Sequence, residues 1–264
     1  MKKILTTILT LGCISSAIAQ TDTTTTDSTT VRVGKKSITI STDGVTVNNP
    51  AKRAKAKGCF RGVGFGLNLL ATREGDVTLP NNIRQWENEP IRSMTWNLNF
   101  YDAFIPITTD RHSLGLVTGL GLTYRSFGFN AKDQEMVTDE NGTSLQDNID
   151  GLKYDKRKFR VTYISAPALV AFNTSTNIKK NFHLSAGVIG NIRIGSLYKR
   201  KYNQDDDQKK LKNRSDFNLN PLSADFTVRA GYRGVTFFFN YGLTPLFRSG
   251  KGPELIPMTF GVQL

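Results

Sequence analysis

The C-terminal stretch from Asp225 to Leu264 alternates between apolar and polar residues in three consecutive segments. The first two segments are separated by a tight turn at Arg233-Gly234, and the third begins at Ile256. A period of two residues is typical of β-strands, because successive side chains point to opposite faces. Strands that are apolar on one face only are what a closed membrane barrel requires. The stretch therefore predicts three barrel strands, of which the last pairs with the first strand of the barrel near Phe65 and Leu67.

The same alternation recurs upstream and yields eight strand candidates after residue 58. The fourth candidate contains Pro167, which lacks a backbone N–H and therefore requires a bulge or another local irregularity. The expected strands are residues 60–71, 92–105, 113–129, 159–172, 182–198, 225–232, 235–242 and 256–264.

Long polar connectors alternate with short ones between these candidates. Bacterial outer-membrane barrels sort their connectors in this way, with long loops outside and short turns in the periplasm. An even number of strands then places both ends of the barrel in the periplasm. The long connectors are residues 72–91, 130–158, 199–216 and 248–255, and the short ones are 106–112, 173–181 and 233–234. We therefore expect an all-β fold, an eight-stranded antiparallel transmembrane β-barrel with a short, partly disordered N-terminal periplasmic segment.

The N-terminal region divides into two parts ahead of the barrel. Residues 1–19 have the charged start, short apolar core and small-residue cleavage site of a signal peptide. A lipoprotein signal acylated at Cys13 is the alternative. Residues 20–58 are expected to be a Thr/Ser-rich and basic periplasmic tether that could contain a small β-hairpin. Residues 59–264 would form the barrel, and the chain would be exported to the outer membrane of a Gram-negative bacterium.

The faces opposite the apolar ones carry charged and amide side chains. Unpaired charges are too costly for a dry core, so these faces are expected to line a polar lumen. Eight strands leave an interior that side chains can fill, which predicts a narrow, plugged lumen and no open pore. A structural polar cluster is predicted from Arg125, Arg193, Asp225 and Arg229, in which Asp225 pairs with neighbouring arginines.

Aromatic residues near the strand ends are candidates for the girdles that flank the apolar band of membrane barrels. These candidates are Trp86, Trp96, Tyr101, Tyr124, Tyr198, Tyr241 and Phe247.

The formal net charge of +13 becomes 13 − 2 = +11 once Lys2 and Lys3 are removed with the signal peptide. An exported protein rarely meets nucleic acid, so we expect no nucleic-acid partner. Membrane lipids and the phosphates of lipopolysaccharide match the charge better. The barrel assembly machinery is a further expected partner, and a periplasmic or secretion-system protein could bind the tether.

The chain contains two histidines, His112 and His183, and both lie at expected periplasmic turns. Ser113 follows His112, but a lipid-modifying enzyme would need its base and nucleophile in hydrogen-bond reach, usually near the outer leaflet. The sequence contains no Gly-x-Ser-x-Gly motif, Walker loop, zinc-ligand spacing or dinucleotide fingerprint. We therefore predict no enzymatic activity, no cofactor and no metal site, with a lipid-modifying enzyme as the weaker alternative.

Several short motifs in the strand regions are rich in glycine and aromatic residues. Residues 163–169 read Tyr-Ile-Ser-Ala-Pro-Ala-Leu, residues 241–247 read Tyr-Gly-Leu-Thr-Pro-Leu-Phe, and residues 259–262 read Thr-Phe-Gly-Val. Over residues 60–264 the chain resembles the PorT-like group of outer-membrane β-barrel proteins, although Leu264 stands where an aromatic residue usually ends the last strand. The resemblance implies a barrel; many members have no assigned activity, and one branch assists protein secretion across the outer membrane. A structural or interaction role is the leading expectation, and an accessory role in secretion is the alternative.

Overall fold

A computed structural model describes residues 60–107, 113–129, 133–147, 154–175, 177, 180–204 and 207–264, together with four short strands between residues 21 and 48. The chain forms two compact units, Met1–Lys55 and Ala56–Leu264. In the first unit, an antiparallel sheet contains β1 (Thr21–Asp22), β2 (Ser28–Val33), β3 (Lys36–Ser41) and β4 (Gly44–Asn48) in that order. These strands fall within the segment predicted to be the tether. The predicted signal peptide lies outside the described residues.

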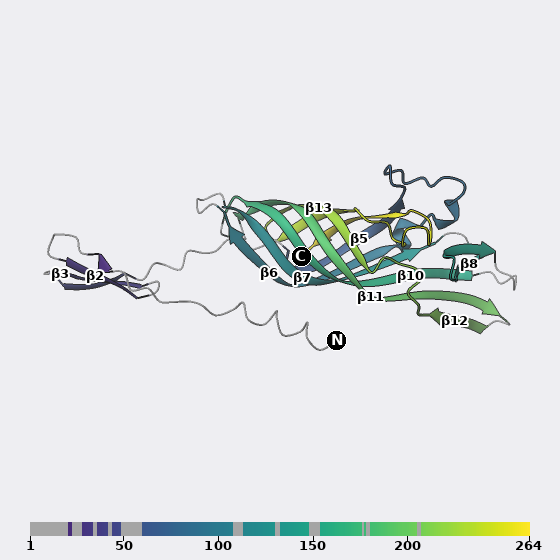
Figure 1. The fold of residues 1–264 in the computed structure, drawn as a ribbon, viewed down its shortest axis with the longest axis horizontal. Helices are drawn as coiled ribbons and strands as arrows, with labels where there is room; N and C mark the ends of the chain where they lie inside the picture. The colour runs from purple at the N-terminus through teal and green to yellow at the C-terminus, as the bar shows by residue number, and fades with distance from the viewer. Residues whose placement is uncertain are drawn as a thin grey trace. The chain divides into compact units, whose positions relative to one another are not determined.

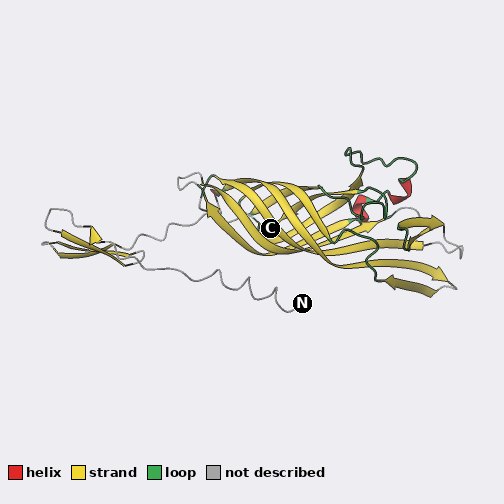
Figure 2. Ribbon diagram, viewed as in Figure 1, coloured by secondary structure: helices red, strands yellow, loops and turns green. Residues whose placement is uncertain are grey.

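Eight antiparallel strands form a closed barrel in the second unit (Figures 1 and 2). Each strand pairs with the next barrel strand along the chain, and the last pairs with the first. The predicted fold class, an all-β eight-stranded antiparallel barrel, is confirmed. The barrel strands are β5 (Gly62–Ala71), β6 (Met94–Pro106), β7 (Ser113–Gly128), β10 (Tyr154–Asn173), β11 (Phe182–Gln204), β13 (Leu222–Tyr232), β14 (Val235–Gly242) and β15 (Ile256–Gln263).

Strand β15 closes the barrel against β5 in the register that the sequence predicts. Phe260 lies opposite Leu67, and Val262 lies opposite Phe65. At the end of the ladder the backbone N–H of Val63 donates to the carbonyl oxygen of Leu264 at 3.0 Å. The reciprocal bond, from the N–H of Leu264 to the oxygen of Val63, measures 2.9 Å. Both ends of the barrel segment therefore lie at the end that carries the short turns.

The long connectors lie together at the opposite end of the barrel, and the described parts of them contain further structure. They include the 3-10 turns η1 (Arg84–Trp86) and η2 (Pro90–Arg92), the hairpin of β8 (Gln134–Thr138) with β9 (Thr143–Asp147), and β12 (Asp207–Asn213), which pairs with the far part of β11. Within the described residues, no helix is long and apolar enough to cross a membrane.

Strands β10 and β11 are longer than the sequence predicts, at 20 and 23 residues. Residues 154–158 and 199–202 continue the β10–β11 ladder, although both segments were expected to be loop. Tyr154 and Tyr202 of these extensions are buried, as is Tyr198 immediately before the second one. Burial of these rings gives the strand extensions a core of their own. A search of the sequence for lipid-facing apolar residues does not predict such strands.

Three register shifts in the barrel ladders depart from simple alternation. In the β10–β11 ladder they lie at Tyr154/Lys156 and Thr162/Tyr163, whereas Pro167 keeps its register against Ile189 of β11. The irregularity at Pro167 is instead a gap in pairing, because the β10–β7 ladder skips residues 166 and 167. In β6 a shift between Asn99 and Tyr101 leaves Tyr101 on the outer face with 54% of its surface exposed, where alternation predicts it to point inward.

Candidate functional site

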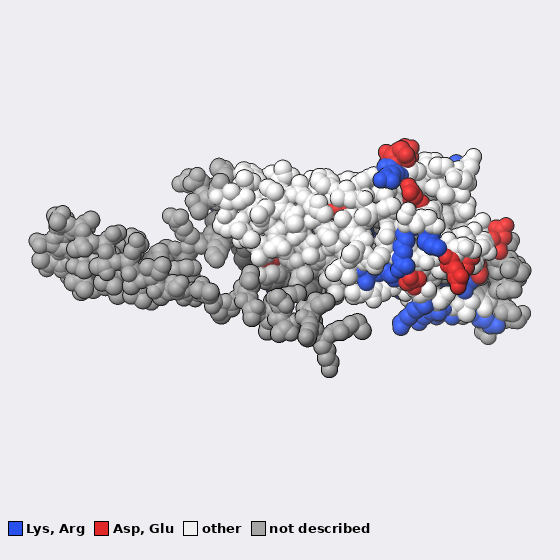
Figure 3. Space-filling view, viewed as in Figure 1, with Lys and Arg blue, Asp and Glu red and all other residues white. Residues whose placement is uncertain are grey.

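The outer wall of the barrel is apolar over most of its height. Figure 3 shows that the wall is almost free of charged side chains, which gather toward the end that carries β8 and β12. Contiguous exposed apolar surface of this extent is rare on soluble monomers and marks contact with lipid or protein. Outward residues with large exposed fractions include Val63, Phe65, Leu67, Trp96, Leu98, Leu116, Leu120, Val170, Leu184, Val188, Ile192, Ile194, Phe226, Phe237 and Phe260.

The centre of the barrel interior contains a buried ion pair between Arg125 of β7 and Asp225 of β13. Arg125 and Asp225 are 3% and 2% exposed, and both terminal nitrogens of the guanidinium contact the carboxylate. The side-chain amide of Asn191 donates a second hydrogen bond to Asp225 Oδ2 at 2.7 Å. The guanidinium also lies over the ring of Tyr163, 5.4 Å from its centroid. Because β7 and β13 are not neighbours in the sheet, the pair joins two walls across the lumen.

The other two arginines of the predicted cluster lie in different surroundings. Arg229 Nη1 donates to Gln263 Oε1 at 2.9 Å, and its guanidinium lies between the rings of Phe60 and Phe238, at 4.9 and 5.3 Å from their centroids. Arg193 is half-buried at a β10–β11 register shift and donates to Ser196 Oγ at 3.3 Å. Of the four predicted residues, the structure thus joins Arg125 and Asp225 directly.

A second polar network, which the sequence reading did not single out, lies nearer the loop end. Asn68 Oδ1 accepts hydrogen bonds from the hydroxyls of Thr95 and Thr259, at 2.5 and 2.9 Å. Asn88, from the first long connector, accepts from the backbone N–H of Leu70 and donates to the backbone oxygen of Asn68, both at 2.8 Å. The signal for this network was the pattern of Asn and Thr on the inward faces, and its function is to hold the connector against the barrel.

The polar side chains leave almost no space between them. A cavity of about 10 Å³ lies among residues that include Arg125, Asn191, Asp225 and Arg229. A buried water needs about 10–15 Å³, so the cavity holds at most one water molecule.

The loop end of the interior is filled by apolar side chains from both the strands and the connectors. Trp86 packs edge-on against Phe129 and Phe247, with ring centroids 5.5 and 5.1 Å apart. Phe159 of β10 packs in the same manner against Phe217, at 5.3 Å. We call this group the loop cap; its buried members are Leu70, Leu79, Trp86, Phe127, Phe129, Met136, Leu145, Phe159, Val161, Tyr163, Tyr198, Phe217, Leu219, Leu246, Phe247 and Leu255.

The loop cap corrects part of the girdle prediction. Trp86, Tyr198 and Phe247 are only 2%, 1% and 2% exposed, so they are interior residues and cannot contact a membrane interface. Trp96 and Tyr101 are about half exposed on the outer wall, as girdle residues must be, and their place in a girdle stays a prediction. The reason for the error is that the connectors fold back over the barrel end and bury their aromatic residues there.

The turn end of the interior has a smaller apolar layer and a buried histidine. The layer contains Phe60, Val117, Leu169, Ala171 and Ile189. Below it, His183 Nε2 lies 2.9 Å from Thr236 Oγ1 in a buried hydrogen bond. This contact gives His183 a structural partner, and His112 lies outside the described residues. In the described part of the chain, no three His, Cys, Asp or Glu residues are grouped as a metal site would require.

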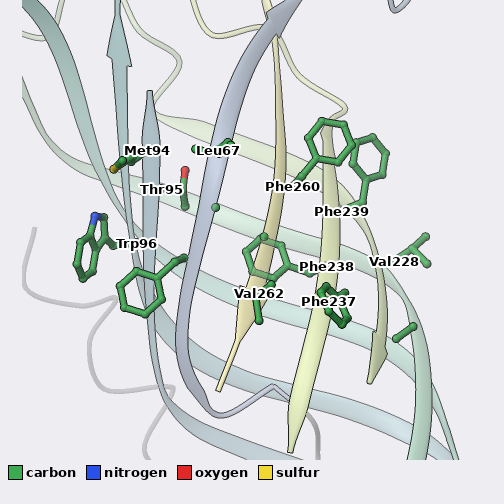
Figure 4. A pocket seen from close by; sticks show the side chains of 14 residues that line it. Leu67, Met94, Thr95, Trp96, Val228, Phe237, Phe238, Phe239, Phe260 and Val262 are labelled. Atoms are coloured by element: carbon green, nitrogen blue, oxygen red, sulfur yellow. The ribbon is translucent and has the colours of Figure 1, made fainter. Parts of the chain in front are cut away.

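A hollow of about 800 Å³ lies on the outer wall over β5, β6, β13, β14 and β15. Figure 4 shows the side chains of Leu67, Trp96, Phe237 and Phe260 among those that line it. Its walls offer hydrocarbon and almost no hydrogen-bonding group, so it has no chemistry of its own. Such a surface fits acyl chains.

A comparison with protein families covers the barrel from its first strand to β14 and ends before β15. The family model described as "Outer membrane protein beta-barrel domain" matches residues 60–248, which include the buried ion pair and most of the loop cap. No curated protein and no solved structure shows a significant match.

Proposed function

Because the chain belongs to the outer membrane protein beta-barrel domain family, we propose that this outer-membrane protein has a structural and interaction role and catalyses no reaction. The observation that carries the proposal is the combination of an apolar outer wall with an interior that its own side chains fill. Lipid replaces water around such a wall, and a filled interior leaves no passage for a solute.

The proposed orientation places the long connectors outside the cell and the short turns in the periplasm. This assignment is supported by the sorting of the connectors to the two ends of the barrel. The unit that contains β1–β4 then belongs to the periplasm, and the signal peptide at residues 1–19 accounts for export.

Fractionation of cells tests the location and the fold together. We expect the protein in the outer membrane, with a gel mobility that changes when the sample is heated in detergent. Recovery in the soluble periplasmic fraction, without a heat-dependent shift, would refute the proposal.

The proposal also predicts that the barrel does not conduct ions. Three interior layers support this: the loop cap, the polar centre around Arg125 and Asp225, and the apolar layer around Phe60. Reconstitution in planar bilayers should give no stable channels. Steady single-channel currents from the purified, folded protein would contradict a sealed interior.

A role as an accessory of protein secretion is the second candidate, and the PorT-like resemblance belongs to it. The specific observation in its favour is the separate four-stranded sheet of the N-terminal unit. The edge strand of a small sheet can pair with an extended segment of another protein. Crosslinking in cells, compared between the full chain and a chain that lacks residues 20–57, tests this role. If every crosslinked partner is retained by the shortened chain, the N-terminal unit does not recruit them.

Mass spectrometry of cellular lipids tests the remaining alternative, a lipid-modifying enzyme. Identical lipid profiles with and without the protein are expected. A lipid species that depends on the protein would contradict the proposed lack of activity.

A further inference from the structure

Six lysines form two cross-strand rows on the outer face of β10, β11 and β12. In one row Lys158 pairs with Lys199, and Lys199 pairs with Lys212; these residues lie directly opposite one another on neighbouring strands. Residues in such positions have Cβ atoms about 5 Å apart on one face of the sheet. The second row has the same arrangement, so the six side chains form a compact array. We call it the lysine grid: Lys156, Lys158, Lys199, Lys201, Lys210 and Lys212.

The grid borders a hollow that could hold an anionic group. Lys156, Lys158, Lys199 and Lys201, together with Arg160, line a space of about 190 Å³. Because a water molecule occupies about 30 Å³ of liquid, this space has room for several waters or for a phosphate group. Figure 3 shows Lys and Arg side chains in blue gathered near the end of the barrel where β11 and β12 lie.

Each cationic group of the grid disfavours the protonated form of its neighbours. Partial burial lowers the pKa of the Lys158 ammonium, and the charges of Arg160, Lys156 and Arg92 lower it further. The pKa of Lys199 is lowered by desolvation and by nearby cations such as Arg160 and Lys201. Among the ion pairs between described residues, none includes Lys158, Lys199 or Lys212. Like charges placed opposite each other destabilise strand pairing, so packing alone does not account for the array.

The grid begins where the apolar outer wall ends. On β10, outward Ile164 is 38% exposed, and Arg160 and Lys158 are the next outward positions after Thr162. Four residues at about 3.4 Å each separate Ile164 from Arg160, and a strand tilt of about 40° reduces this to about 10 Å along the membrane normal. The headgroup region of one leaflet is about 5–8 Å thick. Long basic side chains can reach back toward it, so the grid lies within reach of headgroup phosphates.

We propose that the lysine grid binds phosphate groups of anionic lipid headgroups in the leaflet at the loop end of the barrel. Charge complementarity and the continuity of the grid with the lipid-facing wall of the same strands identify a lipid as the occupant. The leaflet assignment rests on the proposed function, under which this leaflet is the outer one and its phosphates are those of lipopolysaccharide. The site gives the strand extensions of β10 and β11 a membrane-surface function that the barrel fold alone does not require.

The test uses the folded full chain in mixed micelles of a nonionic detergent. The probe is a purified diphosphorylated lipid A, and binding is measured by native mass spectrometry over a range of lipid concentrations. The grid variant carries Lys158→Gln, Lys199→Gln and Lys212→Gln. A matched variant, Arg73→Gln/Arg84→Gln/Arg248→Gln, removes the same charge from exposed positions elsewhere at the loop end. Both variants should keep the heat-dependent gel mobility of a folded barrel.

Each basic residue near an anionic lipid surface contributes a factor of about five in affinity. We therefore expect the grid variant to bind lipid A at least tenfold more weakly, and the matched variant to bind within threefold of the unmodified chain. Dephosphorylated lipid A should bind equally weakly to all three proteins.

Several outcomes would overturn the proposal. Equal losses in the two variants would mean that net charge, and not the grid, sets the affinity. Equal binding of lipid A and its dephosphorylated form would exclude phosphate recognition. Stronger grid-dependent binding of inorganic phosphate or of an acidic peptide than of lipid A would exclude a lipid as the occupant. Because the assay is performed in detergent, a failure there refutes the grid alone, whereas failed outer-membrane fractionation refutes the proposed function.

Discussion

The middle of the barrel and its loop end have opposite polarities, and strand β10 passes through both. In the middle, Ile164 faces outward and is exposed, while Ser165 is buried in a hydrogen bond to Asn191 Oδ1. Toward the loop end, Phe159 is fully buried and Lys158 faces outward. The same strand thus changes from apolar outside and polar inside to the reverse within a few residues.

Strand β11 changes in the same manner. Ile192 is exposed and Asn191 is buried in the middle, whereas Tyr198 is buried and Lys199 faces outward near the loops. The register shift of the β10–β11 ladder at Thr162/Tyr163 lies between the two regions. The medium outside a strand therefore decides which of its residues face inward. Where lipid surrounds the strand, the polar side chains face inward. Where water surrounds it, the apolar side chains do. The change marks the level at which lipid gives way to water.

The buried ion pair gives the largest expected effect in the middle region. Substitution of Asp225→Ala leaves Arg125 buried without its carboxylate, and removal of one partner from such a pair costs about 3–5 kcal/mol. Urea unfolding from lipid vesicles, followed by tryptophan fluorescence, measures the change. The control is Glu254→Ala, because the exposed pair of Glu254 with Arg73 contributes less than about 1 kcal/mol.

The double variant Arg125→Met/Asp225→Leu sharpens this prediction, because it removes both charges at once. It should recover part of the stability that Asp225→Ala loses. If Asp225→Ala is as harmless as Glu254→Ala, the polar centre does not stabilise the barrel in the manner described.

The loop cap should behave like the core of a soluble protein. Substitution of Trp86→Ala removes a ring that contacts Phe129 and Phe247, and is expected to cost about 3 kcal/mol. Limited proteolysis of the protein in vesicles should then cut the first connector faster. Cleavage at an unchanged rate, with an unchanged free energy of unfolding, would indicate that the cap does not hold this connector.

A charge at an exposed apolar position should have different effects in the two regions. Val188→Arg puts a guanidinium on the lipid-facing wall and should cost about 2 kcal/mol, since arginine on this face of a membrane barrel costs about 2–4 kcal/mol at the bilayer midplane. Leu211 of β12 is similarly exposed, but it is surrounded by water. Leu211→Arg should therefore lower the free energy of unfolding by less than about 0.5 kcal/mol. Equal costs in vesicle unfolding experiments would remove the distinction between the regions.

The smallest expected effect is a pH dependence from the lysine grid. The folded-state pKa of Lys158 is lowered from 10.5, so the unfolded chain binds more protons in the pH interval just below that value. The unfolding free energy should therefore rise as pH increases through this interval, because loss of the proton relieves first the desolvation of the Lys158 ammonium and then its repulsion by neighbouring cations. Unfolding in zwitterionic detergent at several pH values measures the slope. Lys158→Gln should flatten it, and an identical slope in the variant would contradict the repulsion.

Much of the middle region could be predicted from the sequence, and little of the loop end could. Alternation locates a strand and its lipid-facing side, so the closure of β15 against Phe65 and Leu67 follows from the pattern. The pattern also indicates which residues point inward, but not which partners they meet across the lumen. The pattern therefore did not indicate that Arg229 donates to Gln263, because the positions of residues on non-neighbouring strands depend on strand tilt and stagger.

The loop end escaped prediction for a different reason. Its strand extensions are rich in charged residues, as in Lys199, Arg200 and Lys201, and this composition resembles that of a solvated loop. These segments are strands because they pair with each other and with β12, and because connector residues pack beside them over Tyr198 and Phe159. The lysine rows could not be predicted from the sequence either, because they arise only when these segments pair as three neighbouring strands.

The level at which lipid gives way to water on the outer face of β10 is the central claim, and nitroxide scanning measures it directly. Single cysteines at Val170, Ala168, Ile164, Thr162 and Lys158, in a chain with Cys59→Ser, are labelled and reconstituted in vesicles. Collision with oxygen and with a water-soluble nickel chelate then gives the depth of each label. We predict labels in lipid from Val170 to Ile164, and water-exposed labels at Lys158, with Thr162 at the boundary. Labels at Val170 and Ile164 that are as accessible to the nickel chelate as the label at Lys158 would contradict the account.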